Sequence, residues 1–549
     1  MNTQKIKQIP LDGWAGLKQN FSKDAMSGFM VFMLALPLSL GIAKASDFPP
    51  IYGLVTAIIG GVIVSFFSGS VLSIKGPAAG LIVIASGAVG AFGGDDKILG
   101  WHYTLAVGLA AGIVQIIFGL LKFGKFSDYF PGAAIHGMLA AIGIIIMSKQ
   151  THFLLGVDPA LLKGKEPLEL LAMIPNSIMH ENPHLAEIGL ACLAVLIGLS
   201  YIKHKHIKKI PPPMFVLAVA IPLGLILHIK TDGAVSNFAL VNVGNIVDIV
   251  KKSPINVDFG GIATHTGSFI QYVILFSLIG SIESLLTVKA IDGMDPFKRR
   301  ANTNKDLTAV GVGNSISAIL GGLPMISEVA RSSANVINGA KTRWANFFHG
   351  LFLLIAVLFA VPFINLIPNA ALAAMLIFVG FKLAHPKEFK HMWHLGIDQF
   401  FIFLVTVILT LATDLLMGVM SGVVLELIIN FIHGAKLKDA FSSKEGKVVV
   451  NPDSIHLILA PNTVFTNILG LKHNIDSIPN SQNVIIDFSK AKIVDHTSMV
   501  ALHDFAELYT ENGGHVKFEG NENLVKTGHD KNSTRKYSEN PQAKNPHNN

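Results

Sequence analysis

The sequence is poor in charged residues. Only 14% of its 549 residues are Asp, Glu, Lys or Arg, whereas an average soluble domain contains about a quarter. Apolar runs of membrane-spanning length recur along the chain instead, 51% of the residues are hydrophobic, and the mean hydropathy is +0.53. These features argue against a large soluble protein and predict an all-α polytopic membrane protein.

Other features are also scarce. Cys192 is the single cysteine, so no intrachain disulfide can form, and its apolar surroundings favour a packing role. The first 24 residues lack the apolar core of a signal peptide. His102, His136 and His349 do not have the spacing of metal ligands, and no nucleophile–base pair or phosphate-binding loop is recognisable. The sequence therefore does not favour an enzyme or a metalloprotein.

Fourteen apolar segments can be recognised between residues 25 and 435. Their approximate ranges are 25–43, 51–67, a short third segment after Pro77, 103–121, 133–147, 188–201, 214–228, 269–291, 307–320, a tenth segment broken at Pro324, 347–363, 370–381, 400–413 and 415–432. The third segment has too few apolar residues to cross the bilayer as a complete helix. Fourteen segments suggest two halves of seven.

Two of these segments are interrupted at corresponding places. Gly76-Pro77 and Gly321-Gly322-Leu323-Pro324 both fall in the third segment of a half. Paired interruptions of this kind indicate the central site of a transporter. Seven segments per half give the halves opposite orientations, so the two half-helix N-termini can face each other. The alternative is a pair of unrelated packing kinks.

The distribution of basic residues predicts the orientation. Loops after even-numbered segments contain most of the Lys and Arg, which places them and both chain ends in the cytoplasm. These residues are Lys122, Lys125, Lys203, Lys205, Lys208, Lys209, Lys298, Arg299, Arg300, Lys305, Lys341, Arg343, Lys382, Lys387 and Lys390. The net charge of +7 therefore reflects short loops rather than a nucleic-acid-binding surface.

The composition divides the chain into four parts. A cytoplasmic segment, 1–24, precedes a transmembrane domain, 25–435, and a small α/β domain, 447–525. Strands in that domain are expected at 454–459, 484–488 and 515–519, and helices at 462–472 and 499–509. Residues 526–549 contain almost no apolar side chains and are predicted to be a disordered tail.

Several motifs resemble the SulP (sulfate-permease-like) family of anion transporters with a C-terminal STAS domain. They are Pro37 in the first segment, Gly76-Pro77-Ala78, the run from Gly280 to Thr287, Pro324 followed by Arg331-Ser332, and Val484 to Phe488 followed by Asp495-His496-Thr497-Ser498. The resemblance implies a 7+7 inverted repeat shared with nucleobase permeases, a core and a gate domain, and usually a homodimer. It also implies a STAS-like cytoplasmic domain, which looks truncated after Glu519.

The two half-helices predict an anion site. Their first turns have free N–H groups and a positive dipole end. The candidate substrate-binding residues are Ala78, Ala79, Ser327, Glu328, Val329 and Arg331. The family has a basic residue at the position of Arg331, although that side chain could instead extend to the membrane interface. Glu328 would repel an anion unless it pairs with Arg331 at i, i+3 or binds a transported proton.

Glu283 is the candidate for cation coupling. It lies in the middle of an apolar segment, where a charge is costly, and Thr287 follows one helical turn later. A carboxylate with a hydroxyl suits Na⁺, and a carboxylate alone suits H⁺; a purely structural role is the alternative. Family members that carry bicarbonate use an acidic residue and a Thr at this spacing for Na⁺. No other cofactor is expected.

These observations predict a secondary active transporter of sulfate or bicarbonate, coupled to Na⁺ or H⁺, in the inner (plasma) membrane. Its expected partners are the anion, the lipid bilayer, a second copy in a homodimer and a soluble partner of the C-terminal domain, but no nucleic acid. The alternatives are a dicarboxylate, other organic-anion or nucleobase permease with the same fold, an anion channel, and a membrane-anchored signalling module. The sequence does not distinguish sulfate from bicarbonate, because backbone dipoles recognise charge rather than identity.

Overall fold

The structure is a computed structural model of the chain. It describes residues 9–162, 165–202, 204, 207, 210–230, 238–244, 257–297, 299–413, 415–435, 446–451, 454–479, 483–511 and 513–539. The chain forms two compact units, which are described separately. Unit 1 comprises Met1–Gly124 and Ile142–Lys382, and unit 2 comprises Lys125–Ala141 and Leu383–Asn549.

Unit 1 is helical, apart from one pair of short strands. Its helices are α1 (Gly13–Ala45), α2 (Pro50–Ile58), α3 (Ile82–Gly93), α4 (Lys97–Leu120), most of α5 (Gly132–Leu154), α6 (Pro167–Met179), α7 (Pro183–Tyr201), α8 (Pro212–Ile226), α10 (Gly260–Thr264), α11 (Thr266–Met294), α12 (Thr303–Ile319), α13 (Val329–Ile337), α14 (Trp344–Phe359), α15 (Val361–Ile364) and nearly all of α16 (Asn369–Leu383). The segment bounds predicted from apolar runs agree with these helices to within several residues, except at α1, which begins 12 residues before the predicted segment.

The membrane-spanning character is clear from length and composition. Among the described residues, seven helices are long and apolar enough to cross a bilayer, and five further apolar helices are shorter. The α2 segment is one of the shorter group, because it continues through a π-helical turn, Ile59–Ile63, to Phe66. A polytopic helical fold is therefore confirmed, whereas the count of fourteen spans stays a prediction.

Local sequence explains where several of these helices begin. The side chains of Asp96, Asn182 and Asn302 accept hydrogen bonds from first-turn N–H groups of α4, α7 and α12. Such N-caps satisfy donors that have no intrahelical acceptor. The loop predicted between residues 148 and 186 also contains a helix, α6, which begins at Pro167 and buries few residues. The apolar pattern missed it because α6 is short and exposed.

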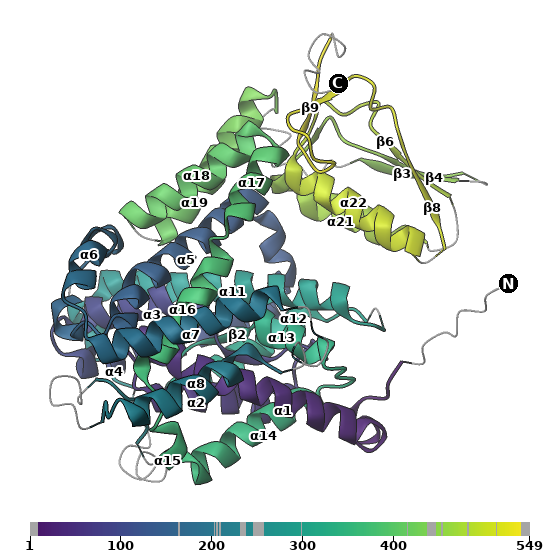
Figure 1. Cartoon of the computed structure of the whole chain (residues 1–549). Coiled ribbons are helices and arrows are strands. Elements are labelled where there is room, and N and C mark those ends of the chain that lie inside the picture. Colours follow the sequence, from purple (N-terminus) through teal and green to yellow (C-terminus); the bar gives the residue numbers. More distant parts are fainter. Residues whose placement is uncertain are drawn as a thin grey trace. The chain divides into compact units, whose positions relative to one another are not determined.

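Unit 2 combines helices with a small α/β domain (Figure 1). The helices are α17 (Pro386–Leu395), α18 (Ile397–Ala412) and α19 (Leu415–Ile432). A four-stranded sheet follows, with the order β3 (Lys447–Val450), β4 (Ser454–Ile458), β6 (Asn483–Asp487) and β8 (His515–Glu519). β3 is antiparallel to β4, and the other pairs are parallel.

The helices α21 (Ile468–Asp476) and α22 (His496–Glu511) pack against this sheet (Figure 1). Ile455, Ile486, Phe488 and Leu502 belong to the shared core. Three of the predicted strands and both predicted helices are therefore present, with boundaries shifted by a few residues. The alternation of buried side chains along β4 and β6 explains why the sequence pattern predicted the strands.

The predicted disordered tail is wrong for its described part. A second sheet has the order β5 (Asn462–Thr463), β7 (Ile493–Val494), β10 (Arg535–Tyr537) and β9 (Leu524–Lys526). β10 pairs antiparallel with both β7 and β9. The composition did not predict β10, because backbone pairing rather than apolar burial holds this strand. Residues 540–549 lie outside the described residues.

Part of the charge argument also lies outside the described residues. This holds for Lys203, Lys205, Lys208, Lys209 and Lys298. The cytoplasmic placement of both chain ends is a statement about a membrane, and the predicted orientation therefore stays a prediction.

Candidate functional site

Two interrupted helices cross within unit 1. The strand β1 (Lys75–Pro77) pairs antiparallel with β2 (Met325–Ser327), and Gly76 lies opposite Ile326. β1 leads into a 3-10 turn, Ala79–Leu81, and then α3, while β2 leads into α13. Gly and Pro before each strand oppose helix formation, which explains why both segments are extended at this point. The structure thus places the two predicted half-helices at one crossing.

The N-termini of both half-helices provide backbone donors. Ala78 is buried in an extended conformation (φ −111°, ψ 141°) and Ala79 begins the first turn. Val329 begins α13 and is 50% exposed. First-turn N–H groups have no intrahelical acceptor, and the helix dipole makes this end positive. The geometry is therefore suitable for an anion, and the assignment of these three residues to a substrate stays a prediction.

Arg331 connects the second half-helix to the first. Its side chain is completely buried, and Nη2 donates to the carbonyl oxygen of Pro77 at 3.3 Å. Nε and Nη1 have no hydrogen-bond partner among the described residues. Gly76 makes this approach possible, because a Cβ there would overlap Nη1. A buried guanidinium with two free nitrogens can bind an oxyanion through two hydrogen bonds.

Glu328 caps the helix that contains Arg331. Its Oε2 accepts from the N–H of Arg331 at 2.8 Å, and the same oxygen is 4.0 Å from the guanidinium Nε. The i, i+3 pairing expected from the sequence is therefore present. The carboxylate partly offsets the positive end of α13 and the charge of Arg331. Protonation or movement of Glu328 would strengthen the positive field at the crossing.

Some predicted anion donors already have partners in this conformation. The N–H of Ser327 donates to Ser284 Oγ at 3.1 Å, and its hydroxyl donates to Asp306 Oδ2 at 3.2 Å. The N–H of Glu328 donates to the carbonyl oxygen of Ile74 at 2.9 Å. An anion could use these donors only if it displaced these partners. Their proposed contact with the substrate stays a prediction.

Glu283 lies at the start of the first half-helix. Its side chain is 8% exposed, and Oε1 has no donor among the described residues. The carboxylate occupies space next to Gly80, where a Cβ would overlap it. Thr287 is also buried and lies one turn further along α11. A carboxylate oxygen without a donor is available to H⁺ or Na⁺, so the geometry permits the predicted coupling role.

Sequence reasoning assigned no role to a second charged pair. Lys75 in β1 and Asp306 in the first turn of α12 form a buried ion pair, with Nζ 2.8 Å from Oδ1. The position of a lysine directly before Gly76-Pro77 could have drawn attention to it. Its partner was not predictable, because Asp306 is 231 residues away in the sequence.

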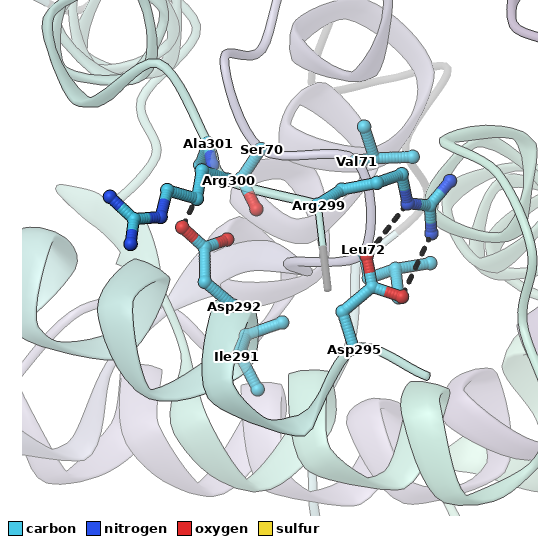
Figure 2. Close-up of a pocket in the computed structure, with 9 residues that line it drawn as sticks. All are labelled: Ser70, Val71, Leu72, Ile291, Asp292, Asp295, Arg299, Arg300 and Ala301. Atoms are coloured by element: carbon cyan, nitrogen blue, oxygen red, sulfur yellow. Dashed lines mark hydrogen bonds and ion pairs between the residues drawn. The ribbon is translucent and has the colours of Figure 1, made fainter. Parts of the chain in front are cut away.

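A separate small pocket lies at the C-terminal end of α11 (Figure 2). Its charged groups are largely paired with each other. Asp295 accepts from Arg299 Nε at 2.7 Å, and Asp292 accepts from the N–H of Ala301 at 2.8 Å. The cavity measures only ≈ 10 Å³, about the size of one water molecule. It therefore lacks the free positive charge found at Arg331.

The histidines do not form a metal site. Within the described parts of the chain, no group of three or more His, Cys, Asp or Glu side chains could hold a metal ion. His349 is completely buried, and neither ring nitrogen has a hydrogen-bond partner among the described residues.

Comparison with known proteins supports the same site. The sequence profile of the sulfate permease family matches residues 21–406. The bicarbonate transporter BicA of Synechocystis sp. is 27% identical over 431 residues, which are 78% of this chain and 72% of BicA. The solved transmembrane domain of a cyanobacterium BicA has a TM-score of 0.64 at 25% identity and covers 73% of this chain and 98% of that chain.

A second solved structure extends the similarity to most of the chain. SLC26A9 has a TM-score of 0.66 at 15% identity, covering 92% of this chain and 85% of that chain. At this level of identity, the likeness shows a shared fold and nothing about substrate.

Proposed function

Because the chain belongs to the sulfate permease family, a family of membrane anion transporters and not of enzymes, we propose that it is a secondary active transporter of sulfate or bicarbonate. The observation that carries this proposal is the buried guanidinium of Arg331 at the crossing of the two half-helices. Two of its nitrogens have no partner in the described structure. A buried positive charge beside two helix N-termini is stabilised by an anion.

The site chemistry favours a small oxyanion. The guanidinium offers two adjacent N–H directions, and the first turns at Ala79 and Val329 add backbone donors. Sulfate and bicarbonate both have oxygens that accept several such hydrogen bonds. The similarity to a bicarbonate transporter and the family description keep both anions as candidates. The same chemistry also allows a carboxylate of an organic anion, which is the main alternative.

We also propose that transport is coupled to Na⁺ or H⁺ through Glu283 and Thr287. The support is the buried Oε1 of Glu283, which has no donor in the described structure. A cation bound there would lie close to Gly80 at the start of the first half-helix. Its charge would favour occupation of the neighbouring anion site. Binding of cation and anion would then be mutually reinforcing, as coupled transport requires.

Several architectural proposals accompany this function. They are fourteen membrane segments in two inverted halves, cytoplasmic chain ends, a plasma (inner) membrane location, a homodimer, and a STAS-like C-terminal domain with a soluble partner. The paired crossing of β1 and β2 supports the inverted halves. The parallel strands with α21 and α22 support a STAS-like fold.

Uptake by purified protein in liposomes tests the proposed function. Radiolabelled sulfate and bicarbonate should be compared under separate Na⁺ and H⁺ gradients. We expect saturable accumulation of one of them against its own gradient when the coupling cation is supplied. Flux that neither saturates nor follows a cation gradient would indicate a channel. Uptake of dicarboxylates in preference to both oxyanions would favour the organic-anion alternative.

A further inference from the structure

Lys75 and Asp306 form a fully hydrogen-bonded charge pair beside the crossing. Their side chains are 0% and 1% exposed, and Nζ lies 2.8 Å from Oδ1. The ammonium group also donates to the hydroxyl of Ser68 at 2.7 Å and to that of Ser73. Three acceptors match the three N–H donors of a lysine. The pair is therefore complete without a ligand.

The carboxylate of Asp306 connects separate parts of the chain. Its Oδ1 accepts from Ser68 Oγ at 2.6 Å and from the N–H of Ser70 at 3.1 Å. Its Oδ2 accepts from Ser327 Oγ at 3.2 Å. Lys75 and Ser327 lie directly opposite each other in the pairing of β1 with β2. Asp306 thus holds both strands of the crossing against the first turn of α12.

Stability alone does not account for such a pair. A buried ion pair can often be replaced by neutral side chains with little loss of stability, although removal of one partner is costly. β1 and β2 have only three residues each, so few backbone hydrogen bonds define their register. A slip of either strand would move the half-helix that follows it, and with it Arg331 or the first turn at Ala79.

We propose that Lys75 and Asp306 are positioning residues for the anion site. They keep β1 and β2 in register and thereby set the separation between the N-termini of the two half-helices. This inference rests on the proposed function, because it concerns the same anion. The pair acts through Ser327 and the strand register, while Arg331 faces the anion.

The full chain in liposomes provides the test, with Lys75→Met combined with Asp306→Asn. This double variant contains no unpaired buried charge, and thermal unfolding and size-exclusion chromatography check its folding. We expect the KM for the transported oxyanion to rise about tenfold while the maximal rate falls less than about threefold. The control combines Arg299→Met with Asp295→Asn, which removes a buried ion pair away from the crossing and should leave the KM unchanged.

A folded double variant with the wild-type KM would overturn the inference, as would an equal KM shift in the control. If the double variant does not fold, Ser73→Ala is decisive, because it removes one acceptor of Lys75 without a charge change. A KM increase of about two- to fivefold is expected there, and an unchanged KM would refute the inference. Absence of saturable uptake of either oxyanion by the wild type would instead refute the proposed function itself.

Discussion

The two half-helices occupy corresponding places but differ in chemistry. The first begins with Ala78 and Ala79, has no side-chain cap, and contains no charged residue. The second is capped by its own Glu328 and contains Arg331. The first half-helix supplies backbone donors and space, whereas the second supplies charge. A repeated backbone arrangement therefore does not imply repeated chemistry.

Glycine explains how the two sides fit together. Gly76 and Gly80 lie on the first side, and each lacks the Cβ that would overlap a charged group from elsewhere. Those groups are the guanidinium of Arg331 and the carboxylate of Glu283. The absence of side chains on one side thus allows opposite charges to approach the same short stretch. The site is asymmetric because the charges come from α11 and α13 while the space comes from β1 and the turn after it.

The largest expected effect concerns the carboxylate beside the first half-helix. Glu283→Gln has nearly the same shape but cannot bind a proton or supply a negative charge to Na⁺. We expect cation-driven accumulation to be abolished, while anion binding to detergent-solubilised protein changes by less than about threefold. Liposome uptake with and without the cation gradient measures the first quantity. Full gradient-driven accumulation by this variant would exclude Glu283 from coupling.

Removal of the guanidinium tests whether the charge of the second side binds the anion. A charge-assisted hydrogen bond contributes about 1.5–3 kcal/mol, so Arg331→Ala should weaken oxyanion binding by about tenfold or more. Arg331→Lys keeps the charge but loses the planar pair of donors, and we expect an intermediate affinity. Equilibrium binding of radiolabelled oxyanion is the measurement. Equal affinity in all three proteins would place the anion elsewhere.

The space on the first side can be removed without changing any charge. In Gly80→Ala the new Cβ would displace the Glu283 carboxylate, and we expect coupled uptake to fall about three- to tenfold. Gly90→Ala is the matched control, because a Cβ at Gly90 meets no atom within 4 Å. Ala is also about 1 kcal/mol more favourable than Gly within a helix. Similar uptake by the two variants would contradict the role given to Gly80.

The smallest effect is expected at Glu328. Glu328→Gln retains an oxygen that can accept from the N–H of Arg331, so the cap of α13 is preserved. It removes a negative charge 4.0 Å from the guanidinium, and oxyanion affinity at neutral pH should rise about two- to threefold. The pH dependence of binding should also become flatter. Binding curves at acidic and neutral pH that coincide with those of the wild type would contradict this prediction.

Much of the fold could be predicted because it depends on local properties. Apolar run length determined the helices of unit 1, and Gly with Pro determined the two interruptions. The strands β4, β6 and β8 followed from short apolar runs between turn residues. The short helix α6 and the strand β10 escaped prediction, since neither buries enough apolar surface to leave a pattern. Pairing with β7 and β9 holds β10, and no local property of Arg535–Tyr537 reveals those partners.

For this protein, the sequence by itself determined which residues are unusual: Glu283 and Arg331 are charges within apolar segments, and such charges require partners. Only the tertiary structure decided what those partners are. Arg331 donates to Pro77, 254 residues away, and Lys75 pairs with Asp306, 231 residues away. It also decided that the donors of Ser327 are already occupied. The physical reason is that burial makes a partner obligatory, while the choice of partner depends on which distant segments the packing of apolar helices brings together.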